Sequence, residues 1–137
     1  MKKPQTNFNN IMLVDDNEID NFINQKIVEG TSFSEHVFVY NSGQSAIEYL
    51  KNLQNNFDFK EELYPEYIFL DINMPMMDGH QFIDEFENLD DKIKDNCKIA
   101  VLTSSLNPVD KSLISKSKRV VSFINKPLTE ESLNELL

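Results

Sequence analysis

The sequence has few of the residues on which several protein classes depend. Cys97 is its single cysteine, which excludes an internal disulfide or a metal site built from several cysteines. Three glycines leave no room for a glycine-rich phosphate loop, and the pattern G-x-x-x-x-G-K-[ST] is absent. The longest apolar runs have four residues, far too few to span a membrane, and no apolar segment follows Lys2 and Lys3. We therefore expect a cytoplasmic protein with an inert cysteine.

Positive charge is also scarce. Lysine and arginine number 13 against 23 aspartates and glutamates, a formal net charge of −10. Nucleic acid and anionic lipid are bound through clustered basic residues, so we expect neither as a direct partner. An apolar share of 40% over 137 residues is enough for one packed core. The acidity fits an ordinary solvated surface, with a carboxylate metal site as the second interpretation.

Five short segments are rich in apolar, β-branched and aromatic residues. They are Ile11–Val14, Val37–Tyr40, Tyr67–Leu70, Ile99–Leu102 and Val120–Ile124. Each segment is too short for a helix, and none alternates regularly between apolar and polar residues. Such continuous runs are typical of strands that are covered on both faces, as in a parallel sheet.

The stretches between these predicted strands carry apolar residues at helical spacing. The stripes are Ile19, Phe22, Ile23 and Ile27; Ala46, Ile47, Leu50 and Leu53; Phe82, Ile83, Phe86 and Leu89; Val109, Leu113 and Ile114; and Leu133, Leu136 and Leu137. Asn17 and Thr129 suit helix caps, and Pro108 suits a first helical turn. Strand and helix thus alternate five times, which predicts an open α/β sheet with helices on both faces.

Polar side chains follow four of the five predicted strands. They are Asp15 and Asp16, Asp71 and Asn73, Thr103, and Lys126. Sites in open parallel sheets form at the carboxyl ends of the strands. The second strand is followed only by ordinary loop residues, so we place it at an edge and predict the strand order 2-1-3-4-5.

One predicted connection is long. Residues 52–65 join the second helix to the third strand and contain several large apolar side chains. We favour a surface insertion that packs on its own aromatic residues. An extended second helix and an aromatic flap are the alternatives.

Three aspartates brought together at the strand ends need a cation. Asp15, Asp16 and Asp71 would repel one another, which raises the pKa of carboxyl groups. A divalent cation and the ammonium group of Lys126 would remove that repulsion. Clustered oxygen ligands are those that Mg²⁺ prefers, so Mg²⁺ is the expected cofactor.

Four motifs, in this order, resemble the receiver domain of response regulators in two-component signalling. They are Leu13-Val14-Asp15-Asp16-Asn17; Phe69 to Pro75 with Met77-Asp78-Gly79; Val101-Leu102-Thr103-Ser104; and Phe123-Ile124-Asn125-Lys126-Pro127. The resemblance covers the chain from about Asn10 onward and implies a flavodoxin-like fold. It also implies phosphorelay signalling by a phosphoacceptor that is not an enzyme in the usual sense. A histidine kinase or histidine phosphotransfer protein would donate the phosphoryl group, and a downstream protein would be the target.

The resemblance implies a role for each metal-binding residue. Asp16 would bind Mg²⁺ directly, Asp15 mostly through water, and Asn73 through its main-chain carbonyl. Asp71 would share the metal and would be the phosphoacceptor, the nucleophile toward phosphohistidine.

The same resemblance implies the phosphoryl contacts and a switch. Thr103 would donate a hydrogen bond to the phosphoryl group, and Lys126 would pair with a phosphoryl oxygen in a loop shaped by a cis bond to Pro127. Inward movement of Thr103 would make room for Phe123, which occupies the switch-aromatic position of the family. Phe123 has no hydroxyl group, so this switch must work by packing alone.

Other interpretations remain beside this one. A haloacid-dehalogenase-like phosphatase needs a second acid where this chain has Asn73. A pseudo-receiver, with the same fold but used only for binding, is the main alternative. We take residues 1–137 as one receiver domain. Eleven residues follow Lys126, so either the last helix is truncated or the receiver is cut from a longer protein.

Overall fold

The strands form one parallel sheet. The computed structural model describes residues 6–55, 64–104 and 117–137. In this part of the chain the strands are β1 (Phe8–Val14), β2 (Ser34–Tyr40), β3 (Tyr67–Asp71), β4 (Lys98–Thr103) and β5 (Val120–Asn125). All neighbouring pairs are parallel, and the order is β2-β1-β3-β4-β5. The five predicted strands and their predicted order are confirmed.

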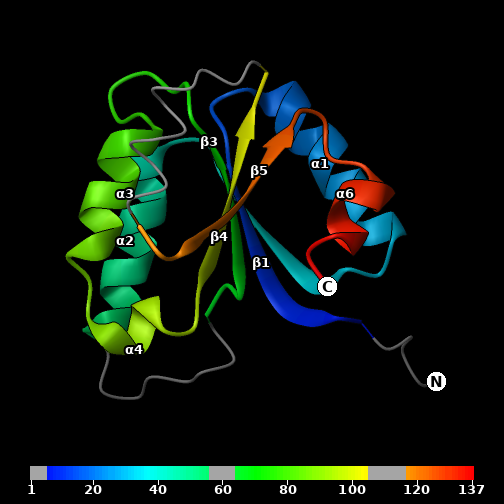
Figure 1. Ribbon diagram of the computed structural model, residues 1–137. Helices are drawn as coiled ribbons and strands as arrows, with labels where there is room; N and C mark the ends of the chain where they lie inside the picture. The colour runs from blue at the N-terminus through cyan, green and yellow to red at the C-terminus, as the bar shows by residue number, and fades with distance from the viewer. Residues whose placement is uncertain (1–5, 56–63, 105–116) are drawn as a thin grey trace.

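Helices cover both faces of the sheet, as predicted (Figure 1). On one face lie α2 (Gly43–Gln54), α3 (Gly79–Glu87) and the short α4 (Asp91–Lys94), and on the other lie α1 (Glu18–Gly30) and α6 (Glu130–Asn134). α4 was not predicted. The helix predicted after Pro108 and residues 56–63 of the long connection lie outside the described residues. Among the described helices none has the length and apolar character needed to cross a membrane.

The face under α2 and α3 is packed by apolar side chains. The predicted stripes of both helices are buried, including Leu50 on α2 and Phe82 and Phe86 on α3. They pack against inward side chains of the sheet such as Ile68 and Val101. Full burial of one such side chain stabilises the fold by about 1.5–3 kcal/mol, so this face anchors the domain.

The face under α1 is packed differently. Asn17 caps α1 as predicted, with its side chain accepting from the backbone N–H groups of Ile19 and Asp20. The apolar stripe of the helix, however, faces solvent: Ile19, Phe22 and Ile23 are 70%, 61% and 40% exposed. Only Ile27 of the predicted stripe packs against the core.

Asparagines occupy the inward face of α1 instead. Asn21 and Asn24 are buried together with Val28. Asn21 Nδ2 donates to the carbonyl oxygen of Asp15 at 2.7 Å, and the backbone N–H of Leu128 donates to Asn24 Oδ1 at 3.0 Å. Each buried amide thus makes one hydrogen bond to a backbone group, while Asn21 Oδ1 is buried without a hydrogen-bond partner among the described residues.

Candidate functional site

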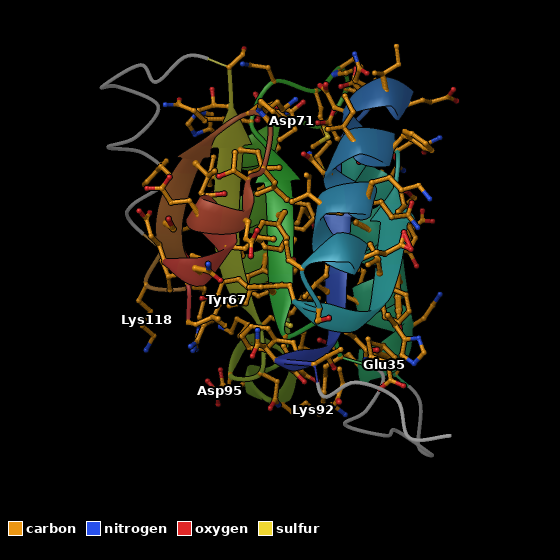
Figure 2. All side chains as sticks on the ribbon, turned by 90° about the vertical axis from the view of Figure 1, so that its right-hand side faces the viewer. Glu35, Tyr67, Asp71, Lys92, Asp95 and Lys118 are labelled. Carbon is orange, nitrogen blue, oxygen red and sulfur yellow. The ribbon has the colours of Figure 1, made fainter. Side chains whose placement is uncertain are left out.

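The predicted site residues converge at one edge of the sheet. Asp71 and Thr103 are the last residues of β3 and β4, while Asp15 and Lys126 directly follow β1 and β5. Figure 2 shows Asp71 at this end of the molecule, with the labelled Lys92 and Asp95 toward the opposite end. The parallel order β1-β3-β4-β5 is what places these four strand ends side by side.

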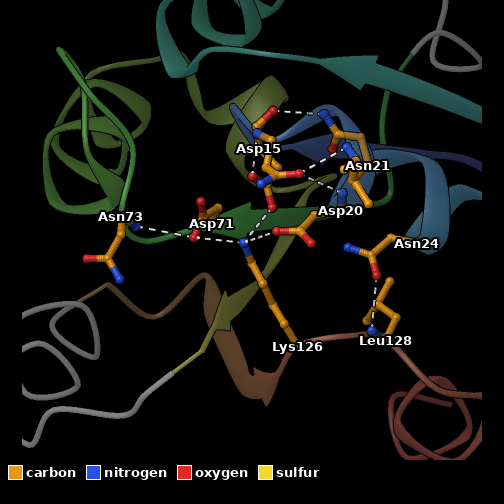
Figure 3. A network of polar contacts seen from close by, with 10 residues as sticks. Asp15, Asp20, Asn21, Asn24, Asp71, Asn73, Lys126 and Leu128 are labelled. Carbon is orange, nitrogen blue, oxygen red and sulfur yellow. Dashed lines mark hydrogen bonds and ion pairs between the residues drawn. The ribbon is translucent and has the colours of Figure 1, made fainter.

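Lys126 is the centre of a network of carboxylates (Figure 3). Its Nζ lies 2.7 Å from Asp15 Oδ2, 3.0 Å from Asp20 Oδ2 and 3.4 Å from Asp71 Oδ1. An ammonium group has three N–H donors, and three carboxylates surround this one. Lys126 therefore neutralises part of an acidic cluster drawn from three separate segments of the chain.

Backbone N–H groups hold the two buried carboxylates in place. The N–H of Asn17 donates to Asp15 Oδ1 at 2.9 Å, and the N–H of Asn73 donates to Asp71 Oδ1 at 3.2 Å. Both bonds span two residues, so each aspartate fixes the turn that follows its own strand. The side chain of Asn73 lies at the surface.

Gly79 brings the start of α3 close to the segment that follows Asp71. A Cβ atom on Gly79 would lie 2.9 Å from the Cα of Ile72, too close for any other residue. The N–H of Gly79 donates to the carbonyl oxygen of Ile72 at 2.9 Å, and Asp78 caps the helix. The glycine thus closes the loop that carries Asn73 against the end of β3.

The loop after β5 is held to the sheet and to α1. The Lys126–Pro127 bond is cis, as predicted. The N–H of Lys126 donates to the carbonyl oxygen of Thr103 at 2.9 Å, while Leu128 is tied to Asn24 of α1. These contacts fix the stem from which the Lys126 side chain extends toward Asp71.

The network changes the acidity of its central groups. Burial raises the pKa of Asp71 to about 6, with Asp15 adding to the effect, while Lys126 and the N–H of Asn73 oppose it. Burial acts to lower the pKa of Lys126, but hydrogen bonds to Asp15 and Asp20 outweigh it and the pKa is raised. Lys126 is therefore charged at neutral pH, and Asp71 keeps its charge less readily than an ordinary aspartate.

Three carboxylates at this edge suit a divalent cation. Asp15, Asp16 and Asp71 each offer an oxygen, and these oxygens lie within 4.8 Å of one another. Asp16 is exposed, whereas the other two are buried. A donor set made only of oxygen, with one side open to water, fits Mg²⁺, which keeps several waters.

Thr103 and Phe123 lie on neighbouring strands. Thr103 is buried at the end of β4, opposite Asn125 of β5. Phe123 lies opposite Val101, is partly buried, and packs against the apolar cluster under α2 and α3. Phe123 thus lies two residues before the register partner of Thr103, on the strand next to it.

Three residues of α1 at this edge were not predicted. Asp20 contacts Lys126, Asn21 contacts the Asp15 backbone, and Asn24 holds the loop after Lys126. The sequence signal that could have indicated these contacts is the spacing of Asn21 and Asn24, which lie three residues apart on one face of the helix. An acid in a first helical turn, such as Asp20, is ordinarily assigned to the helix dipole.

The family model described as response regulator receiver domain matches residues 11–137 of this chain. A curated protein, response regulator Rcp1 from a Synechocystis strain, is 26% identical over 100 residues. That match covers 73% of this chain and 65% of the relative, so the chain spans less than two thirds of that protein's length.

Solved structures share the fold along nearly the whole chain. A two-component response regulator from Cytophaga hutchinsonii is 32% identical with a TM-score of 0.83, and the match covers 96% of this chain and 95% of that one. A two-component response regulator from Legionella pneumophila is 26% identical with a TM-score of 0.76, covering 93% and 94%. The phosphorylated cyanobacterial phytochrome response regulator RcpA is 25% identical with a TM-score of 0.72, covering 94% and 88%.

Proposed function

The chain belongs to the response regulator receiver domain family, and on that premise we propose that Asp71 accepts a phosphoryl group in a phosphorelay. The observation that carries the proposal is the position of the Asp71 carboxylate. It is buried at a strand end, 3.4 Å from the ammonium group of Lys126, with the oxygens of Asp15 and Asp16 beside it. We propose that residues 1–137 act as one receiver domain.

The proposed reaction transfers a phosphoryl group between two side chains. An oxygen of Asp71 attacks the phosphorus of a phosphohistidine, the P–N bond breaks, and a P–O bond forms. The donor imidazole leaves with the electron pair of the P–N bond and takes up a proton from water. The product is an acyl phosphate on Asp71, which water hydrolyses back to the carboxylate and inorganic phosphate.

Asp15, Asp16, Asp71 and the main-chain carbonyl of Asn73 would hold Mg²⁺. When bound, the ion supplies positive charge where the oxygens of the transferring group gather. Among the described residues, Lys126 partly balances two of these carboxylates, with its Nζ 2.7 Å from Asp15 Oδ2 and 3.4 Å from Asp71 Oδ1.

Lys126 and Thr103 are proposed to receive the new charge. A phosphoryl group on Asp71 adds negative charge and strong acceptor oxygens. Lys126 already approaches Asp71, so its ammonium group pairs with a phosphoryl oxygen after a small movement. Thr103 ends the strand next to β3, from which its hydroxyl donates to a second oxygen.

Phe123 is proposed to report the phosphorylation. Movement of Thr103 toward the phosphoryl group makes room on the neighbouring strand, and Phe123 turns into it. We expect the NMR signals of the Phe123 ring to shift on phosphorylation in the wild type and not in Thr103→Ala. Unchanged signals in the phosphorylated wild type would contradict the switch while leaving the chemistry of Asp71 intact.

A small phosphodonor tests whether Asp71 accepts a phosphoryl group. We expect acetyl phosphate with Mg²⁺ to add one phosphoryl group to the intact protein, measured by mass spectrometry. The gain is expected to disappear with EDTA and in Asp71→Asn. The matched control is Asp84→Asn, which removes an exposed acid from α3 and is expected to be phosphorylated like the wild type. A wild type that is never phosphorylated would favour a pseudo-receiver used only for binding.

The partners follow from the reaction. We propose a histidine kinase or a histidine phosphotransfer protein as the donor and a downstream protein as the target. The solved structure of RcpA, which shares 25% identity with this chain, is that of a phosphorylated response regulator and supports the proposal that this chain is phosphorylated.

A further inference from the structure

Asp20 is an additional acid within reach of the site, and it stands outside the expected metal cluster. Its Oδ2 lies 3.0 Å from Lys126 Nζ, although the two residues are 106 positions apart in the sequence. The carboxylates that gather for a cation are Asp15, Asp16 and Asp71, without Asp20. Asp20 thus interacts with the site through Lys126.

The helix that carries Asp20 is held in place by hydrogen bonds of its backbone and of neighbouring residues. The backbone N–H of Asp20 is capped by Asn17 Oδ1 at 3.0 Å. The next residue, Asn21, is bonded to the Asp15 backbone at 2.7 Å, and Asn24 is bonded to Leu128 at 3.0 Å. When the Lys126 side chain moves toward Asp71, the backbone of Asp20 therefore stays in place.

Burial determines which partner Lys126 gives up. Side-chain exposure is 2% for Asp15 and 35% for Asp20. A buried carboxylate that loses its cation is left without water, which is strongly unfavourable, whereas Asp20 is open enough to be hydrated again. Of these two partners, Asp20 is therefore the one released at the smaller free-energy cost.

We infer that Asp20 is a positioning residue that holds Lys126 beside α1 until a phosphoryl group on Asp71 takes the lysine from it. This inference rests on the proposed function of Asp71. The ion pair between Asp20 and Lys126 forms in the unphosphorylated protein and breaks in the phosphorylated one. Asp20 thereby lowers the affinity of the site for a phosphoryl group and keeps α1 connected to the loop after β5.

The test uses beryllofluoride, an analogue of the phosphoryl group, at saturating Mg²⁺. We expect Asp20→Asn to bind it about three- to ten-fold more tightly than the wild type, measured by ¹⁹F NMR, because the variant removes the competitor for Lys126. The control is Glu18→Gln, which removes an exposed acid from the same helical turn. We expect its affinity to change less than two-fold.

A second measurement separates positioning from a general charge effect. The ¹³Cε and ¹Hε signals of Lys126 are expected to differ between Asp20→Asn and the wild type without beryllofluoride. With beryllofluoride bound they are expected to coincide, since Lys126 of the wild type has then left Asp20 and Lys126 of the variant has no carboxylate at position 20. Signals that stay apart in the bound state, or an affinity for beryllofluoride unchanged in Asp20→Asn, would overturn the inference. A wild type that binds no beryllofluoride would instead refute the proposed function itself.

Discussion

Helices α1 and α3 both carry an apolar stripe at helical spacing, and they use it in opposite ways. On α3, Phe82 and Phe86 are fully buried against the sheet. On α1, Ile19 and Phe22 are 70% and 61% exposed, and the face against the sheet carries Asn21 and Asn24. Both helices begin near the carboxyl edge of the sheet, but α1 adds buried asparagines to the apolar packing of Ile27 and Val28, whereas the buried face of α3 is apolar.

The two kinds of contact contribute differently to the stability of the fold and to the positions of the site residues. Apolar packing under α3 is strong and does not depend on the orientation of any one polar group. The bonds under α1 are directional: Asn21 binds the backbone of Asp15, Asn24 binds the loop after Lys126, and Asp20 binds Lys126 itself. α1 thus holds the site in place through polar contacts that α3 lacks, in addition to the apolar packing on its own side of the sheet.

The largest expected change in the free energy of unfolding comes from a substitution on the packed face under α2 and α3. Phe86→Ala leaves a cavity under α3 and is expected to lower the free energy of unfolding by about 3–5 kcal/mol. Urea unfolding followed by circular dichroism measures this. If the loss were below about 1 kcal/mol, the contrast between the two helices would not hold.

The second-largest effect is expected on the stability of the fold when Asp71 is replaced. This effect depends on pH, whereas the effect of Phe86→Ala does not. Burial and Asp15 raise the pKa of Asp71 to about 6, so the ionised carboxylate weakens the metal-free fold above pH 6. This loss disappears as the pH falls toward the ordinary carboxyl pKa, where folded and unfolded states both bind the proton. Asp71→Asn is therefore expected to be more stable than the wild type at pH 8, by on the order of 2 kcal/mol.

Urea unfolding of both proteins in EDTA at pH 8 and pH 4.5 tests whether Asp71→Asn is the more stable one and whether its advantage depends on pH. The advantage of Asp71→Asn is expected to shrink at the lower pH, while the loss in Phe86→Ala stays the same at both. A variant less stable than the wild type at pH 8 would contradict the assigned cause of the shift.

A smaller effect is expected from the polar face of α1. Asn24→Ala removes the acceptor of the Leu128 N–H in a buried place and is expected to destabilise the fold by about 1.5 kcal/mol. Amide hydrogen exchange of Leu128 should become faster in this variant than in the control Gln25→Ala. Equal protection in both would mean that the bond between α1 and the loop does not hold that loop.

The smallest effect is expected on the outer face of α1. Phe22→Ala changes an exposed side chain and is expected to alter the free energy of unfolding by less than about 0.5 kcal/mol. The same urea measurement compares it directly with Phe86→Ala. A large loss in Phe22→Ala would show that the stripe is covered in solution.

The sheet was predictable because apolar runs and the rules of parallel sheets leave few arrangements. The runs at Ile11–Val14 and Tyr67–Leu70 mark strands buried on both faces, and polar residues mark the strand ends that meet at one edge. The position of α1 was not predictable in the same way. Periodicity locates a helix, but it does not say that Asn21 and Asn24 will be buried to satisfy backbone groups.

The site was predictable in its strand-end residues and not in its α1 contacts. Asp15, Asp71, Thr103 and Lys126 converge because each ends or follows a strand. Asp20 sits in the first turn of a helix, where an acid is favourable without any tertiary partner. Its pairing with Lys126 depends on the side chain of a residue 106 positions away, which no local pattern encodes.

The most direct test of the account is to locate the phosphoryl group. After acetyl phosphate and Mg²⁺, reduction of the acyl phosphate with borohydride converts the modified aspartate to homoserine, which peptide mass spectrometry locates. We expect homoserine at Asp71 alone. Homoserine at Asp15 or Asp16, or at none of the three, would contradict it.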